Sequence, residues 1–225
     1  MTASNHDSHL HFITLVRHGK SLGNAEGRIQ GQSDYPLTQH GLQQARLLAA
    51  HWQAEQVSFE RIISSPLTRA RQTAEIVAEA LCIPVNFDPA WMERNFGRYD
   101  GRIFQEILQE HPEGLDLYHP YDPVGETGES VVDLYVRAGR AVQDLLRCPP
   151  GRYLVVSHGA ILNMALYAIL GLSPQGGSRG PRFRFGNTAV TQLSYDSDQR
   201  QWWLLSFNNL AHLQAMKPGL AESDG

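Results

Sequence analysis

Short runs of β-branched and aromatic residues alternate along the chain with longer segments whose apolar positions recur at helical spacing. The short runs predict four strands, at residues 12–16, 61–64, 83–87 and 153–156. Two further runs, at residues 189–194 and 202–207, are joined by a polar turn and predict an antiparallel hairpin. Within this hairpin, Trp202 and Trp203 are expected to lie on opposite faces of the strand, one of them packed inward.

The segments between the predicted strands have the pattern of amphipathic helices. Thr38 can cap a helix whose buried face we expect to comprise Leu42, Ala45, Ala49 and Trp52. Pro66 fits the first turn of the next helix, where proline is tolerated. Three more helices are predicted at residues 104–110, 130–146 and 159–170. Alternating strands and helices favour a mostly parallel sheet that is covered by helices on both faces.

The predicted fold is therefore a single-domain three-layer α/β/α sandwich with a mostly parallel sheet and a C-terminal antiparallel hairpin. No linker, internal repeat or low-complexity tract divides the chain. We expect the domain to span residues 12–210, with flexible termini at residues 1–11 and 211–225.

Composition excludes several classes of protein. The chain has 225 residues, 42% of them hydrophobic, and a net charge of −4 without a basic run, which argues against a nucleic-acid partner. No apolar stretch approaches the ~20 residues of a membrane span, and residues 1–11 do not resemble a signal peptide, so we expect a cytoplasmic protein. Cys82 and Cys148 do not form a zinc-binding pair or a disulfide framework.

Charged and imidazole side chains follow the predicted strands at their carboxyl ends, where ligands collect in open α/β sheets. Arg17 and His18 follow the first strand, Arg69 the second, Glu93 the third and His158 the fourth. A neutral imidazole is a competent nucleophile toward phosphorus, and arginines bind and neutralise phosphoryl oxygens. A carboxylic acid can protonate a leaving alcohol. No metal-ligand motif accompanies these residues, and the set predicts phosphoryl transfer through a covalent histidine intermediate.

These residues belong to sequence blocks that resemble a known family. Residues 15–24 (LVRHGKSLGN) are similar to the opening signature of the histidine phosphatase superfamily, in the branch shared with cofactor-dependent phosphoglycerate mutases. Further matching blocks follow in the family's order at residues 34–38, 64–70, 93–97, 100–101, 128–130 and 157–159. The ordered set is a much more specific signal than one Arg-His-Gly tripeptide.

The resemblance implies roles for individual residues. It makes His18 the phosphorylated nucleophile and Glu93 the proton donor. The phosphate pocket that it implies consists of Arg17, Asn24, Arg69 and His158, with His158 stabilising the transferring group by hydrogen bonding. Gln30 and Gly31 match a loop that borders the substrate, and we place Ser21 with them, although Ser21 and Asn24 could equally form a turn. The family requires no metal for this chemistry, and a homodimer would be compatible with it.

The main alternative within the family is mutase activity. The mutase branch has Tyr at the position of Phe96, Lys at that of Phe104 and Asn at that of Ala160. It also carries an Arg pair before the second histidine, whereas no Arg-Arg occurs between Glu93 and His158. Each difference removes a polar contact to a small phosphorylated acid, and a site built on such contacts discriminates steeply. The sequence therefore favours a metal-independent phosphomonoester hydrolase that acts on a small phosphorylated metabolite without a cofactor.

Two other functions remain open at this point. An esterase is disfavoured because Val155 stands where the nucleophile elbow needs glycine. A non-catalytic phosphate-binding protein would use the same fold, which does not by itself secure activity.

Two local features also remain open. Lys20 stands at a position where the family usually has Glu or Gln. The loop with Arg179, Arg182 and Arg184 could form a cationic lip for a second anionic group or could be only a solvated loop.

Overall fold

A mixed sheet forms the middle layer of the molecule. The computed structural model describes residues 9–174 and 180–214, and within these ranges six strands are arranged in the order β3-β2-β4-β1-β5-β6. Their bounds are β1 (Leu10–Arg17), β2 (Arg61–Ser64), β3 (Val85–Phe87), β4 (Gly151–Ser157), β5 (Val190–Asp196) and β6 (Gln201–Asn209). The first four strands are parallel to one another, whereas β5 runs antiparallel to β1 and to β6. The predicted sheet and hairpin are confirmed.

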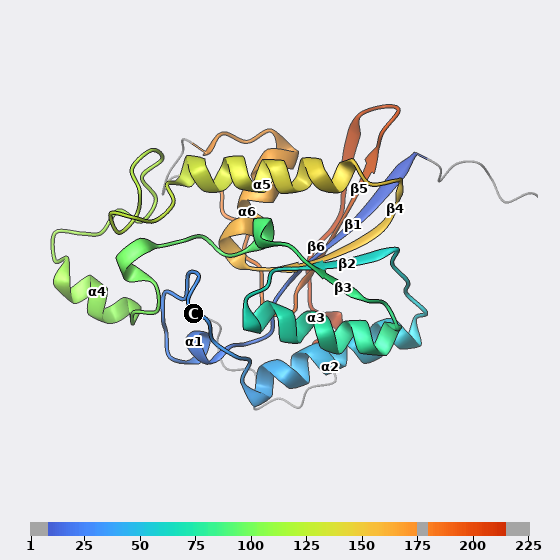
Figure 1. Ribbon diagram of the computed structural model, residues 1–225, viewed down its shortest axis with the longest axis horizontal. Coiled ribbons are helices and arrows are strands. Elements are labelled where there is room, and N and C mark those ends of the chain that lie inside the picture. The colour runs from blue at the N-terminus through green and yellow to red at the C-terminus, as the bar shows by residue number, and fades with distance from the viewer. Residues whose placement is uncertain (1–8, 175–179, 215–225) are drawn as a thin grey trace, which may run out of the picture.

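Helices cover both faces of this sheet. The longer helices are α2 (Gln39–Ala54), α3 (Thr68–Leu81), α5 (Val131–Leu146) and α6 (Gly159–Leu170), and the shorter ones are α1 (Leu22–Ala25) and α4 (Phe104–Glu110). Three 3-10 helices are also described, at η1 (Pro89–Trp91), η2 (Gly97–Tyr99) and η4 (Ala211–Leu213). Helices α2 and α3 lie below the sheet in Figure 1, and α5 and α6 lie above it. The three-layer α/β/α fold is therefore confirmed.

The central strands supply side chains to both layers because successive residues of a strand point to opposite faces. On β1, Ile13 and Leu15 belong to the cluster that packs with α5 and α6, whereas Val16 belongs to the cluster that packs with α2 and α3. On β4, Val155 joins the first cluster and Leu154 the second. Strands that are buried on both faces read as continuous apolar runs, which explains why β1 and β4 were identifiable in the sequence.

The start of each helix depends on local or distant caps. Thr38 caps α2 as predicted, because its hydroxyl accepts a hydrogen bond of 3.0 Å from the backbone N–H of Gly41. Helix α3 begins at Thr68 and not at Pro66, so the predicted start was two residues early. The carboxylate of Asp34 accepts hydrogen bonds from the backbone N–H and the hydroxyl of Thr68, at 2.7 and 2.6 Å. A cap from a residue so distant in sequence could not be read from the local pattern.

Both predicted domain boundaries fall inside elements of the structure or next to them. Strand β1 begins at Leu10, so two residues of the expected N-terminal tail belong to the sheet, and His11 is buried there. Helix η4 lies in the expected C-terminal tail, where Nε2 of buried His212 is 2.9 Å from the hydroxyl of Thr188. Residues 1–8 and 215–225 of the two predicted tails lie outside the described residues.

Two other expectations concern single elements. The third strand begins at Val85, two residues later than predicted. Trp202 packs against the core, whereas Trp203 is 41% exposed, so the two rings do divide between the faces of β6. Across residues 9–174 and 180–214, we find no helix long and apolar enough to span a bilayer.

The packing of β4 predicts a large effect of truncating Leu154, which is completely buried. Leu154→Ala should lower the free energy of unfolding by about 2–5 kcal/mol, because it removes buried methyl groups and leaves a cavity. Leu205→Ala is the matched control: Leu205 is 55% exposed on β6, and its truncation should lower the free energy of unfolding by less than about 1 kcal/mol. Urea denaturation of both variants measures this, and equal losses would contradict the assignment of the core.

Candidate active site

The carboxyl ends of the central parallel strands bring the predicted residues together. Strands β1 and β4 are neighbours, and the rings of His18 and His158, which follow them, have centroids 5.1 Å apart. Arg69 enters from the first turn of α3, and Glu93 from the loop after η1. A cavity of about 500 Å³ opens here. Its lining includes Arg17, His18, Asn24, Gln30, Gly31, Arg69 and Glu93, seven of the nine site residues that the sequence predicts.

The environment of His18 fixes both its tautomer and its charge. Its ring is 2% exposed, and Nδ1 lies 2.7 Å from the carbonyl oxygen of Gly19. A carbonyl can only accept, so Nδ1 carries the proton and Nε2 keeps its lone pair. Burial and the positive charges of Arg69 and Arg17 hold the pKa of His18 well below its ordinary value of 6.5. The imidazole is therefore neutral, which is the form a nucleophile requires.

The backbone beside His18 is held by close packing of two glycines. A side chain at Gly19 would come within 2.6 Å of the carbonyl oxygen of Gly41 in the first turn of α2. The N–H of Gly19 also donates to the hydroxyl of Thr73, at 3.0 Å, and the amide of Asn187 donates to the carbonyl oxygen of His18, at 2.8 Å. These contacts orient the Gly19 carbonyl that selects the His18 tautomer.

The guanidinium of Arg69 is held by three hydrogen bonds. Its Nη1 donates to the carbonyl oxygen of Ser33 at 2.9 Å, its Nη2 to that of Gly31 at 2.7 Å, and its Nε to Nδ1 of His158 at 3.2 Å. Burial lowers the pKa of Arg69 to about 10, with opposing contributions from nearby carboxylates, so the group stays cationic at neutral pH. It supplies a fixed positive charge at the floor of the cavity.

The contact with Arg69 determines the state of His158. Because arginine can only donate, Nδ1 of His158 is unprotonated and its Nε2–H points to the hydroxyl oxygen of Ser65, 2.7 Å away. Burial and the charge of Arg69 lower the pKa of His158 well below its ordinary value. Both ring nitrogens of His158 thus have protein partners. The sequence predicts a hydrogen bond from His158 to the transferring phosphoryl group, and to form it the Nε2–H must leave Ser65 and bond to the ligand. Ser65 lies in the matching block at residues 64–70, which was the sequence signal for it.

Glu93 binds the N-terminus of α6. Its Oε1 accepts backbone hydrogen bonds from Arg94 at 2.9 Å, Ala160 at 3.1 Å and Ile161 at 3.2 Å. The N-cap residue His158 makes no side-chain cap of its own, so Glu93 satisfies donors that the helix would otherwise leave open. The carboxylate is thereby fixed at the border of the cavity, beside the strand end that carries His158.

Arg137 of α5 holds the loop that carries Glu93. It donates to the carbonyl oxygens of Ala90, Met92 and Glu93 at 2.9, 2.7 and 3.2 Å. Its other donors form two hydrogen bonds of 2.7 Å with the carboxylate of Glu129. The sequence offered no role for Arg137, because a single arginine on an amphipathic helix is indistinguishable from a surface charge. Glu129 lies in one of the matching sequence blocks, which was the only signal for this ion pair.

Ser21 shapes the binding loop and does not line the cavity. It is fully buried, and its hydroxyl oxygen lies 2.9 Å from Oδ1 of Asn24 and 2.7 Å from Oε1 of Gln30. Because Oδ1 of Asn24 faces Ser21, the amide nitrogen of Asn24 is the atom that can donate to a ligand. Gly31 has a φ of +49°, and a side chain there would overlap the carboxylate of Asp100. The prediction that Ser21 contacts substrate is therefore corrected to a positioning role.

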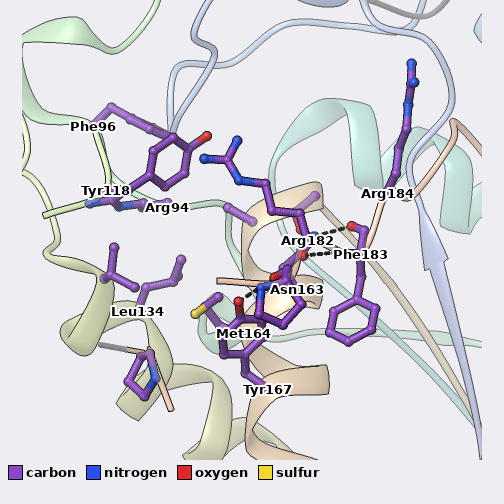
Figure 2. Close-up of a pocket in the computed structure, with 15 residues that line it drawn as sticks. Arg94, Phe96, Tyr118, Leu134, Asn163, Met164, Tyr167, Arg182, Phe183 and Arg184 are labelled. Carbon is purple, nitrogen blue, oxygen red and sulfur yellow. Dashed lines mark hydrogen bonds between the residues drawn. The ribbon is translucent and has the colours of Figure 1, made fainter. Parts of the chain in front are cut away.

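A second cavity, of about 420 Å³, is drawn in Figure 2. Phe96 and Tyr118 line both cavities and so form the boundary between them. The guanidinium carbon of Arg182 lies 4.0 Å from the centre of the Tyr118 ring, whereas Arg184 extends away from the other lining side chains (Figure 2). Arg179, the third arginine of the predicted loop, lies outside the described residues.

The charge that a bound anion would meet comes from arginine side chains. Arg17, Arg28 and Arg69 all line the first cavity. In the described part of the chain, no three His, Cys, Asp or Glu side chains are grouped so that they could hold a metal ion. The arrangement can therefore bind a phosphoryl group on arginine and amide donors, next to a neutral imidazole and a carboxyl group.

Comparison with known proteins agrees with this geometry. Residues 13–210 match the Histidine phosphatase superfamily (branch 1). A curated relative, named probable phosphoglycerate mutase GpmB, from Escherichia fergusonii, is 37% identical over 216 residues, which cover 93% of this chain and 97% of the relative.

Solved structures with the same fold include phosphatases. Bacillus stearothermophilus YhfR has a TM-score of 0.79 and 30% identity, with 90% of this chain and 99% of that chain covered. A variant of phosphoserine phosphatase from Entamoeba histolytica, in complex with phosphoserine, has a TM-score of 0.73 and 28% identity, with 90% and 98% covered. The match to the family extends over nearly all of the described residues, and the chain belongs to branch 1 of the histidine phosphatase superfamily.

Proposed function

We propose that this protein is a metal-independent phosphomonoester hydrolase that works through a phosphohistidine at His18. The observation that carries the proposal is the state of His18: it is buried, neutral and bonded through Nδ1, so that Nε2 is available in an arginine-lined cavity. Phosphatases among the structural neighbours support hydrolysis, and one of them is bound to phosphoserine, a small phosphomonoester.

In the first step, Nε2 of His18 attacks phosphorus in line with the leaving oxygen. The N–P bond forms as the P–O bond to the alcohol breaks, and Glu93 gives its proton to the departing oxygen. Arg17, Arg69 and the amide of Asn24 donate to the three non-bridging oxygens, whose charge grows in the transition state. Because Arg69 is already fixed by two backbone carbonyls and His158, it needs little reorganisation during the reaction.

In the second step, water attacks the phosphohistidine. The carboxylate of Glu93, now deprotonated, accepts a proton from this water as the N–P bond breaks. Inorganic phosphate is released, and both His18 and Glu93 return to their initial states. The backbone donors at the start of α6 keep the Glu93 carboxylate in one place for both proton transfers.

A mutase is the second candidate, because curated relatives carry that name. The cavity argues against it. Phe96 and Phe104, at positions where the mutase branch carries polar residues, both line the phosphate cavity. Ala160, the third such position, lines the adjoining one. Apolar side chains in these places remove three polar contacts that the mutase branch would offer to a phosphoglycerate, which favours hydrolysis of a different class of ester.

The nucleophile is tested by His18→Ala. Hydrolysis of p-nitrophenyl phosphate in excess EDTA should be detectable in the wild type and should fall by at least about a thousandfold in the variant. His119→Ala is a matched control at a histidine whose side chain is 44% exposed, and it should retain activity. Wild-type enzyme quenched in alkaline denaturant, where the acid-labile N–P bond survives, should carry phosphate on histidine. Turnover that survives in His18→Ala would contradict the assignment, and isomerisation of phosphoglycerate without phosphate release would identify a mutase.

The proton donor is tested by Glu93→Gln, which keeps the shape of the side chain but cannot give up a proton. Alkyl phosphates have basic leaving groups and should be hydrolysed about a hundredfold more slowly or worse. p-Nitrophenyl phosphate has an acidic leaving group and should lose less than about tenfold. The ratio of kcat/KM for the two substrates is the measurement. An equal loss on both would show that Glu93 does not act as the acid.

The charge of His18 is tested by its titration. Burial and the two arginines lower its pKa, so the ring should remain neutral as the pH falls through 6.5. The unfolded chain, with ordinary histidines, binds more protons than the folded protein below that pH, so the free energy of unfolding should decrease with falling pH. NMR of the labelled histidine ring, with urea-unfolded protein as the reference, measures this. A folded-state midpoint at or above 6.5 would contradict a neutral nucleophile held by its surroundings.

A further inference from the structure

The second cavity contrasts in character with the first. Leu134, Met164 and Phe183 face it from α5, α6 and the segment before β5, and Phe96 and Tyr118 close it toward the phosphate cavity (Figure 2). No aspartate or glutamate is among its described lining residues. A largely apolar hollow of about 420 Å³ lies in the size range of small-molecule sites.

Two polar residues of this lining direct their polar atoms to the protein. The amide of Asn163 donates to the carbonyl oxygens of Gly159 and Phe183, at 2.9 and 2.6 Å, and accepts from the N–H of Phe183 at 2.8 Å. The hydroxyl of Tyr167 donates to the carbonyl oxygen of Pro181. These bonds fasten the segment 181–183 to α6, and they leave aliphatic and aromatic surface toward the hollow.

Arg94 shows the same arrangement. Its side chain is 2% exposed; Nε and Nη2 donate to the carbonyl oxygen of Glu129, at 2.9 and 2.7 Å, and Nη1 donates to that of Leu117, at 2.6 Å. Its guanidinium is thus engaged on every nitrogen, and it lies 5.1 Å from the centre of the Phe96 ring. Three of the five N–H donors of Arg94 are therefore occupied by backbone oxygens, which limits what this side chain can offer to a ligand.

The position of the cavity relates it to the leaving group. Ala160 lines it, and the backbone N–H of Ala160 is bonded to the carboxylate of Glu93, the proposed proton donor. The oxygen that Glu93 protonates therefore lies where the two cavities meet, near Phe96 and Tyr118. A phosphoryl group bound at His18 would direct its ester oxygen toward this junction, and the alcohol part of the substrate would continue into the second cavity.

We infer that the second cavity is the leaving-group subsite and that the substrates are phosphomonoesters of bulky, predominantly apolar alcohols. This inference rests on the proposed function and specifies its substrate class. Burial of carbon in the cavity supplies the binding energy, and Arg182, stacked on Tyr118 at the mouth, covers its outer edge. Small hydroxy acids are poorer substrates because they bury less carbon in this cavity.

The subsite is tested by binding of n-alkylphosphonates, from ethyl to hexyl, whose C–P bond cannot be hydrolysed. Titration calorimetry should show the dissociation constant falling by up to about fourfold for each added methylene, or about two orders of magnitude over the series. Inorganic phosphate should displace every member, because all share the site at His18. A dissociation constant that does not change with chain length, or ligands that phosphate does not displace, would overturn the inference.

Substitutions on α6 test whether the alkyl chain binds in the second cavity. Met164→Gln keeps the length of the side chain but places an amide in the cavity. In this variant the dissociation constant should fall by less than about twofold for each added methylene. Met164→Leu keeps an apolar side chain of similar volume and should preserve the gain, which separates polarity from loss of folding. Leu170→Gln is the control at the end of the same helix, where the side chain is 41% exposed, and it should bind like the wild type. A full chain-length effect in Met164→Gln would place the alkyl group elsewhere.

Hydrolysis assays distinguish a failure of this inference from a failure of the proposed function. The matching n-alkyl phosphates share one leaving-group acidity, so kcat/KM should rise with chain length and should be lost in His18→Ala. Hexyl phosphate should exceed O-phosphoserine by about a hundredfold. Hydrolysis without dependence on chain length would overturn the subsite and leave the hydrolase standing. Chain-length-dependent phosphonate binding without any ester hydrolysis would overturn the hydrolase and leave the subsite standing.

Discussion

The site depends on one buried cation. Arg69 is 1% exposed, and a guanidinium can be kept charged at such a position only if its donors are satisfied. Two backbone carbonyls from the loop before α2 and the ring of His158 meet that requirement. Burial, and after it the same charge, lowers the pKa of His18 and of His158, since both imidazoles would have to ionise away from water and beside a cation. The binding loop, the phosphate cavity and the protonation state of His18 are therefore all linked to this side chain.

Glu93, the proton donor that we propose, is held by a second set of interactions. Glu93 caps α6, and Arg137 of α5 binds three carbonyl oxygens of the loop that carries it. The bidentate contact of Arg137 with Glu129 keeps this arginine in place. The two helices that cover one face of the sheet thus fix the proton donor, while the elements on the other face fix Arg69. The sheet edge between them defines where phosphorus can lie.

This division explains how one family can include proteins with different names and substrates. The phosphoryl side of the site is made by strand ends and helix starts, which the fold places firmly. The leaving-group side is made by the segments around Tyr118 and Arg182, which connect elements and are free to vary. A shared phosphoryl site with a variable leaving-group side is the expected result, and our proposal for the alcohol of this chain's substrate rests on the apolar second cavity.

The sequence by itself determined the strands, the helices and the identity of the central residues, because buried strands are continuous apolar runs and motif residues follow them directly. Thr38 marked the start of its helix locally. The tertiary structure alone decided what depends on distant partners. Asp34 caps α3, Ser21 supports the binding loop and does not line the cavity, and Arg137 pairs with Glu129. The neutral state of His18 and the apolar second cavity arise from side chains far apart in the chain, whose contacts no local pattern encodes.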